Sequence, residues 1–261
     1  MKRYRSIDAS AAWPAIRSVR PLELAAGLDP RSIRERAMDA GGGLSFFFGA
    51  SDVSDEALGL LYKAAQELEL VGQYRALASG ELMNQGEERM VLHHLLRGRP
   101  AGPVVKDGRD FRAFYEGERA RFSSFASRVR SGELVSPSGA AFSEVVQIGI
   151  GGSDLGPRAL YLALEQWARE RGLLKLRASF ISNVDPDDAN AVLSTVDARR
   201  ALFILVSKSG TTQETLANEA IVKALVGRLP GVDPSRQFVA VTSETSPLAK
   251  NPGYLDSFYI D

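Results

Sequence analysis

Four hydroxyl side chains fall within one short segment of this 261-residue sequence. Within the predicted loop Val206–Thr215, the six residues from Ser207 to Thr212 contain these four hydroxyls, at Ser207, Ser209, Thr211 and Thr212, together with the cation Lys208. Hydroxyl groups, a cation and main-chain amides at the start of a helix suit a phosphomonoester dianion. The segment therefore predicts a phosphate-binding loop. An ordinary serine or threonine cap of the following helix is the alternative, although a cap needs only one hydroxyl.

A glycine-rich segment, Gly149–Pro157, predicts a second loop for the same anion. Glycines let the backbone approach a ligand closely, and the free amides at a helix start favour an anion, with the Ser153 hydroxyl directed at the same space. The dinucleotide fingerprint does not fit, because Asp154 stands where its third glycine belongs. The nucleotide-triphosphate P-loop also fails, since Pro157-Arg158 replaces its lysine and hydroxyl. A glycine turn that serves only chain geometry is the alternative.

The elements that must position these loops follow Ser136–Gly139, where the sequence changes character. Short apolar runs predict strands over Glu144–Ile150, Leu176–Ser182, Ala201–Val206, Gln237–Thr242 and Leu255–Ile260. Helices are predicted near Gly156–Arg171, Pro186–Thr195 and Thr211–Leu229, with a shorter one near Pro247–Asn251. This alternation predicts an α/β fold with a doubly wound, five-stranded parallel sheet of flavodoxin-like type. Ligands bind such sheets at the carboxyl ends of the strands, where both loops lie.

The residues before the sheet predict a mainly helical N-terminal region. Apolar spacing predicts a helix over Asp55–Leu70 with Ser54 as its N-cap, and another over Phe111–Arg130 with Gly132 as its stop. We therefore expect two domains, a helical region over residues 1–139 and the sheet domain over residues 140–261.

Composition excludes several classes of protein. Hydrophobic residues make up 44% and charged residues 25%, as in ordinary soluble proteins. Because 32 basic and 32 acidic side chains cancel, no global field attracts nucleic acid or an anionic membrane. The absence of cysteine excludes disulfides, thiolate metal sites and a cysteine nucleophile. We expect a cytoplasmic protein, since no signal peptide pattern opens the chain and the longest apolar run, Ala201–Val206, is too short to span a bilayer.

Longer strings around these loops resemble the glucose-6-phosphate isomerase family and its sugar-isomerase (SIS) type of phosphosugar-binding domain. The four strings, in order, are Asn84–His93, Ile148–Pro157, Ser182–Asp185 and Ser207–Thr215. The resemblance runs from about Phe46 to the end of the chain. Gly86 departs from the threonine expected there, and Ser209-Gly210 is similar to the bacterial variant rather than to the Thr-Phe of many members.

The resemblance implies an activity and a set of site residues. The family interconverts glucose 6-phosphate and fructose 6-phosphate, an aldose and a ketose, in glycolysis and gluconeogenesis. No metal or organic cofactor is implied, and family members are homodimers whose sites take residues from both subunits. The residues expected to hold or line the substrate phosphate are Gly152, Ser153, Ser207, Lys208, Ser209, Thr211 and Thr212.

The matching stops at Asp261, before the family's main catalytic base and ring-opening acid. Glu214 is the only supporting catalytic residue that carries over, and an acid that complements the helix dipole is its alternative reading. A packing or solvent-exposed role is expected for His93 and His94. We expect the chain alone to bind sugar phosphate weakly and to isomerise it poorly, with a C-terminal half or a second subunit as partner. The last strand is expected to leave Leu255, Phe258 and Ile260 exposed.

Two other functions remain open. A non-catalytic phosphosugar-binding module would share the hydroxyl loop, but the neutral charge and the Asn84–His93 string argue against it. An isomerase of amino-sugar or pentose phosphates would share the loop chemistry without the full Ile148–Pro157 string.

Overall fold

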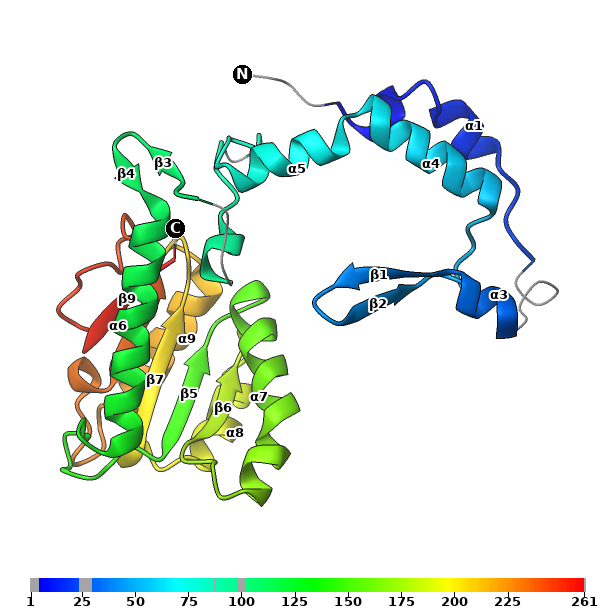
Figure 1. Ribbon diagram of the computed structural model, residues 1–261. Coiled ribbons are helices and arrows are strands. Elements are labelled where there is room, and N and C mark those ends of the chain that lie inside the picture. Colours follow the sequence, from blue (N-terminus) through cyan, green and yellow to red (C-terminus); the bar gives the residue numbers. More distant parts are fainter. Residues whose placement is uncertain (1–4, 24–29, 87, 98–101, 261) are drawn as a thin grey trace. The chain divides into compact units, whose positions relative to one another are not determined.

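The computed structural model describes residues 5–23, 30–86, 88–97 and 102–260 (Figure 1). The chain forms two compact units, Met1–Val91 and Leu92–Asp261. The second unit therefore contains residues 92–139 as well as the sheet. As a boundary between domains that fold independently, residue 139 stays a prediction. No helix within the described ranges is long and apolar enough to cross a bilayer.

The first unit combines short helices with a hairpin. Its elements are η1 (Ile7–Ala9), α1 (Trp13–Ser18), α3 (Pro30–Glu35), β1 (Ala37–Gly41), β2 (Leu44–Phe47), α4 (Asp55–Glu67) and α5 (Leu70–Ala78). Ser54 caps α4 as predicted, because its hydroxyl accepts the Ala57 amide at 3.1 Å. The helix predicted to reach Leu70 ends at Glu67 instead, since Glu69 takes a left-handed φ of 53° and α5 begins after it. The antiparallel β1–β2 hairpin was not predicted.

The second unit is built on a five-stranded parallel sheet, as predicted. Its strands are β5 (Glu144–Ile148), β6 (Arg177–Ile181), β7 (Ala201–Val206), β8 (Phe238–Thr242) and β9 (Asp256–Tyr259). They lie in the order β6-β5-β7-β8-β9 and all four neighbouring pairs are parallel. The longer helices are α6 (Phe111–Ser131), α7 (Gly152–Glu170), α8 (Pro186–Ser194) and α9 (Gln213–Val226). The helix predicted near Pro247–Asn251 is a series of turns.

Short elements complete this unit. They are η2 (His93–Leu96), the β3–β4 hairpin (Val105–Lys106 and Arg109–Asp110), η3 (Ala198–Arg200) and η4 (Pro234–Arg236). Asp110 caps α6 by accepting the Arg112 amide at 2.9 Å. Gly132 ends α6 with a left-handed φ of 77°, which confirms the predicted stop.

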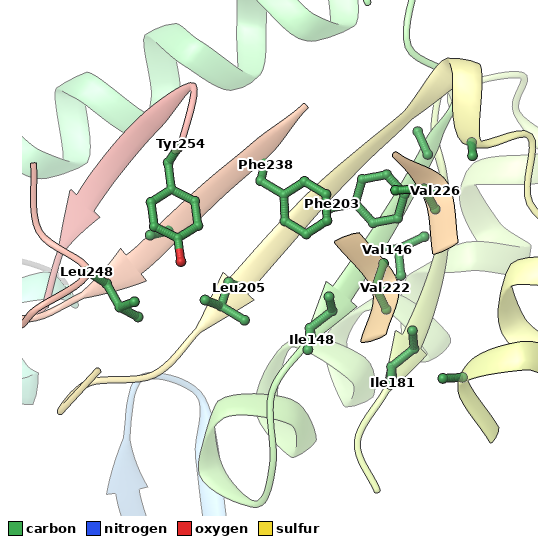
Figure 2. Close-up of a cluster of buried hydrophobic side chains, with 14 residues drawn as sticks. Val146, Ile148, Ile181, Phe203, Leu205, Val222, Val226, Phe238, Leu248 and Tyr254 are labelled. Carbon is green, nitrogen blue, oxygen red and sulfur yellow. The ribbon is translucent and has the colours of Figure 1, made fainter. Parts of the chain in front are cut away.

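Helices cover both faces of the sheet. On one face the rings of Phe203 and Phe238 stack with centroids 4.6 Å apart, and Val222 and Val226 of α9 join the same buried cluster (Figure 2). On the other face Val129 of α6 is buried with a second set of side chains, Leu202, Val239 and Phe258. Alternate residues along β7 thus point to opposite layers, as a doubly wound sheet requires.

The last strand is covered from a distant part of the sequence. Phe258 is only 7% exposed, because the ring of Phe125 on α6 packs edge-on against it at 5.2 Å. The Glu118 carboxylate, also on α6, accepts the Tyr259 amide at 2.8 Å. The expectation of an exposed Phe258 is therefore wrong, and Leu255 and Ile260 are partly buried. The cover therefore comes from α6, which is more than 100 residues earlier in the sequence.

A buried polar network joins α9 to the loop between β8 and β9 at Tyr254. The Tyr254 hydroxyl donates to Glu219 Oε1 at 2.6 Å, and Lys223 Nζ lies 2.6 Å from the same oxygen. Burial, and next the Glu219 carboxylate, raise the pKa of Tyr254. The unfolded chain therefore loses this proton at a lower pH than the folded one. The stability that this hydroxyl contributes is fully present below about pH 10 and is lost as the pH rises further.

The Tyr254→Phe substitution is expected to lower the free energy of unfolding by about 1.5–3 kcal/mol at neutral pH, because it removes a hydrogen bond to a charged group. It should also flatten the decline of stability above about pH 10. Urea denaturation between pH 7 and 11 measures both effects. Tyr62→Phe is the control, since Tyr62 is 67% exposed. An equally steep alkaline decline in the Tyr254→Phe variant would contradict the expectation.

Candidate functional site

The two predicted loops leave the sheet where its topology reverses. From β5 the chain passes through α7 to β6 on one side, and from β7 it passes through α9 to β8 on the other. Such a switch point between neighbouring parallel strands leaves a crevice at their carboxyl ends, where ligands bind. Ile148 and Leu205 pair in register, so Gly149 and Ser207 start their loops at nearly the same level.

The loops approach each other closely at Gly149. A Cβ added to Gly149 would lie 3.1 Å from the Ser153 Cβ and 3.3 Å from the carbonyl oxygen of Val206. Both distances are tighter than ordinary contacts. Ser153 and Val206 therefore both pack against Gly149, one from each loop. A larger residue at position 149 would not fit between them.

The first loop opens directly into a helix. Gly151 has φ 58° and ψ −120°, a conformation that glycine adopts without strain. The helix α7 begins at Gly152, four residues before the predicted start, and Ser153 is half-buried in its first turn. Gly151 and Gly152 are exposed, and neither donates its amide to another described residue. These amides and the Ser153 hydroxyl form the kind of helix start that binds anions.

The second loop carries its hydroxyls in two pairs. Ser207 Oγ and Thr212 Oγ1 lie 3.0 Å apart, with Ser207 buried, while the hydroxyls of Ser209 and Thr211 lie 3.0 Å apart and are exposed. Thr212 is the N-cap residue of α9, yet its side chain caps no amide. The simple capping alternative therefore does not describe Thr212. Lys208 is half-buried and forms no ion pair with another described residue.

A third loop, after β6, accepts hydrogen bonds from side chains of α7 and α9. Asn218 of α9 donates its side-chain amide to the Asn183 carbonyl at 2.9 Å. Arg158 of α7 donates to Ser182 Oγ at 2.9 Å and to Asp154 Oδ1 at 3.0 Å. The guanidinium thus compensates the buried Asp154 carboxylate in the first turn of α7. The Ser182–Asp185 string therefore belongs to this edge of the sheet.

Sequence reasoning gave no role to these supporting side chains. Asp154 and Arg158 stand four residues apart on a helix, a spacing that predicts an ion pair. A polar residue within a buried strand, such as Gln147, is a further signal, because a buried polar group needs a partner. Asn218 offered no comparable sequence signal, since its partner is a main-chain carbonyl.

The remaining candidate residues are Glu214, His93 and His94. Glu214 is exposed in the first turn of α9, and its supporting role in catalysis stays a prediction. His93 is exposed and His94 half-buried on η2. The Asn84–His93 string crosses from the first compact unit to the second, and Glu87 lies outside the described residues.

Gly210 gives a test of the second loop. Its φ is +66°, and an added Cβ would lie 2.7 Å from Ser246 Oγ. Gly210→Ala is expected to lower the free energy of unfolding by about 2–4 kcal/mol, through backbone strain and crowding together. Gly139→Ala is the control, since φ is +79° there but nothing lies within 4 Å, and it should cost about 1 kcal/mol. Equal losses in urea denaturation would show that Ser246 does not crowd this position.

Comparison with known proteins adds an independent result. The family model for phosphoglucose isomerase matches residues 48–253. A glucose-6-phosphate isomerase of Treponema pallidum is 51% identical over 266 residues, which cover 99% of this chain and 50% of that protein. One from Treponema denticola is 49% identical over 231 residues, covering 88% and 43%. The crystal structure of a glucose-6-phosphate isomerase from Chlamydia trachomatis matches 98% of this chain and 48% of its own, with a TM-score of 0.80 at 30% identity.

The family match covers both candidate loops, and the structural match extends over 98% of this chain. The chain spans about half the length of the curated relatives it matches. With 206 consecutive residues (48 through 253) matched to one family model, the chain belongs to the phosphoglucose isomerase family.

Proposed function

We propose that this chain supplies the phosphate-binding half of an aldose–ketose isomerase that interconverts glucose 6-phosphate and fructose 6-phosphate. The observation that carries the proposal is the approach of two loops at Gly149, each of which opens the N-terminus of a helix. A phosphate dianion between them would meet amides, hydroxyls and the ammonium of Lys208. The proposed contacts are Gly152, Ser153, Ser207, Lys208, Ser209, Thr211 and Thr212.

These groups account for recognition of the phosphate. A charge-assisted hydrogen bond to a phosphate oxygen contributes roughly 1.5–3 kcal/mol, and both helix dipoles favour the anion. Anchoring the phosphate would also hold the sugar carbons in one place, which lowers the entropic part of the barrier to proton transfer between C2 and C1. Glu214, in the first turn of α9, would support the acid–base chemistry.

The main base and the ring-opening acid are proposed to come from the other half of the family polypeptide. In a homodimer, each site would also receive residues from the second subunit. We further propose that the complete enzyme works in the cytoplasm, in glycolysis and gluconeogenesis. The chain alone would then bind sugar phosphate but turn it over slowly.

Calorimetric titration of the 261-residue chain tests this proposal. Glucose 6-phosphate, fructose 6-phosphate and inorganic phosphate are expected to bind, and unphosphorylated glucose is not. Tighter binding of glucosamine 6-phosphate or arabinose 5-phosphate would favour a different phosphosugar isomerase. A coupled assay should detect only slow turnover, and an ordinary rate would contradict the placement of the main base outside this chain.

A further inference from the structure

The helix α7 contains a gap in its hydrogen-bond ladder directly at the candidate site. Pro157 lies inside this helix and has no N–H, so the carbonyl of Ser153, four residues earlier, has no donor from the helix itself. The side chain of Gln147 fills the gap, since its Nε2 donates to the Ser153 carbonyl oxygen at 2.8 Å. Gln147 comes from the buried strand β5 and is only 7% exposed.

The second loop has an equivalent arrangement. Thr242, fully buried at the end of β8, donates its hydroxyl to the Ser207 carbonyl oxygen at 2.8 Å. Ser246 Oγ lies 2.5 Å from Thr242 Oγ1. Because the single Thr242 proton is directed at Ser207, Ser246 must be the donor between these two hydroxyls. Two of the three serines proposed to hold the phosphate, Ser153 and Ser207, thus have carbonyl oxygens that accept a hydrogen bond from a strand side chain.

We propose that Gln147 and Thr242 are positioning residues of the phosphate site, an inference that rests on the proposed function. Each would hold a carbonyl oxygen inward, away from the dianion that it would otherwise repel. The peptide unit is planar and trans, so its carbonyl and N–H point in opposite directions. Fixing the Ser207 carbonyl inward therefore turns the Lys208 amide outward, and that amide donates to no other described residue.

The same reasoning applies to the first loop. Fixing the Ser153 carbonyl sets the orientation of the Asp154 amide, which donates to the Gly151 carbonyl at 3.0 Å and closes the first turn of α7. That turn presents the Gly152 amide and the Ser153 hydroxyl. Gln147 therefore acts on the anion site through the backbone, without touching the anion.

The test uses two substitutions that keep the shape of the side chain, Gln147→Met and Thr242→Val. Each is expected to weaken binding of inorganic phosphate and glucose 6-phosphate to the full chain by about tenfold in calorimetry, the factor for about one lost hydrogen bond. Thr242→Ser should restore the affinity. In nuclear magnetic resonance spectra the Lys208 amide signal should shift on phosphate addition in the unsubstituted chain, and less in Thr242→Val.

A matched control separates positioning from general stability. Gln237 is fully buried and donates its side-chain amide to the Ala198 and Ala201 carbonyls at 2.8 and 2.9 Å, at the amino end of β7. Gln237→Met should therefore lower stability without changing phosphate affinity. A loss of affinity equal to that of Gln147→Met would overturn the inference.

The role of Pro157 allows a second test through a double-mutant cycle. In the Pro157→Ala variant the restored main-chain amide can donate to the Ser153 carbonyl, so Gln147→Met should weaken phosphate binding by less than about threefold in that background. An undiminished tenfold loss would overturn the role assigned to Gln147.

The two proposals fail in different ways. If the unsubstituted chain binds neither phosphate nor sugar phosphate, the proposed function fails and this inference fails with it. If the unsubstituted chain binds and both variants bind equally well, only the inference fails. If Thr242→Val does not fold, the test is the Lys208 amide signal in the unsubstituted chain. The inference predicts that this signal shifts at saturating phosphate, and an unchanged signal would contradict it.

Discussion

Substitution of Ser153 by aspartate is expected to abolish phosphate binding while leaving the fold at least as stable. Ser153 is the second residue of α7, where a carboxylate interacts favourably with the helix dipole by about 0.3–1 kcal/mol. The same carboxylate would stand beside the proposed dianion, where like charges repel by several kcal/mol. We expect affinity for inorganic phosphate and glucose 6-phosphate to fall by at least about 100-fold in calorimetry.

The opposite signs of the two effects make this substitution informative. Ser153→Asn is the matched control, since it has nearly the size of aspartate without the charge, and it should lose much less affinity. Ser194→Asp, at the last residue of α8, should leave phosphate binding unchanged and lower stability by about 0.3–1 kcal/mol, because a carboxylate opposes the dipole at a helix C-terminus. Retained phosphate affinity in the Ser153→Asp variant, with urea denaturation showing an intact fold, would remove Ser153 from the site.

Phe203→Ala is expected to produce the largest loss of stability in the second unit. The Phe203 side chain is fully buried at the centre of the sheet and stacks on Phe238 at 4.6 Å (Figure 2). Truncation removes buried apolar surface and leaves a cavity, which together cost about 3–5 kcal/mol. That is a large part of the 5–15 kcal/mol by which a typical protein is stable, so the sheet should unfold at a markedly lower urea concentration.

Phe122→Ala provides the comparison, because Phe122 is 43% exposed on α6 and should cost about 1 kcal/mol or less. A double-mutant cycle with Phe238→Ala should give a coupling energy of about 0.5–1.5 kcal/mol for the stacked rings. Additive losses would show that the two rings contribute only through burial.

The central strands could be predicted because burial on both faces leaves a plain signal. Ala201–Val206 is apolar at every position, and the observed strand has the predicted bounds. The start of α7 was predicted less accurately, four residues too late. Pro157 suggested a position in the first turn, whereas the helix tolerates it at the sixth residue because Gln147 replaces the missing donor. The hydrogen bond from Gln147 is a tertiary contact, so the local sequence of α7 does not reveal it.

The first unit departs most from the prediction because its signals are weak. The β1–β2 hairpin has almost no buried face, so its strands show no useful alternation. Glu69 adopts a left-handed φ of 53°, a conformation that a glutamate does not favour, and local preference therefore gave no reason to end α4 before it.

The composition of the loops was predictable, but their support was not. Glycines and hydroxyls are visible in the sequence, and the sheet topology then places Gly149 and Ser207 at the same edge. Thr242 donates a hydrogen bond to the Ser207 carbonyl because the pairing of β7 with β8 brings these two residues together. The sequence alone does not show this contact. The roles of the individual site residues stay predictions.

The long-range contact between Glu118 and Tyr259 has a consequence for biosynthesis. These residues are 141 positions apart, so α6 leaves the ribosome long before β9 is translated. At about 5–20 residues per second, the nascent helix waits for roughly 7–28 s with the face that later covers Phe258 unoccupied. The edge of the sheet can close only at the end of this interval, so the Phe125 ring lacks its Phe258 partner until the last strand is translated.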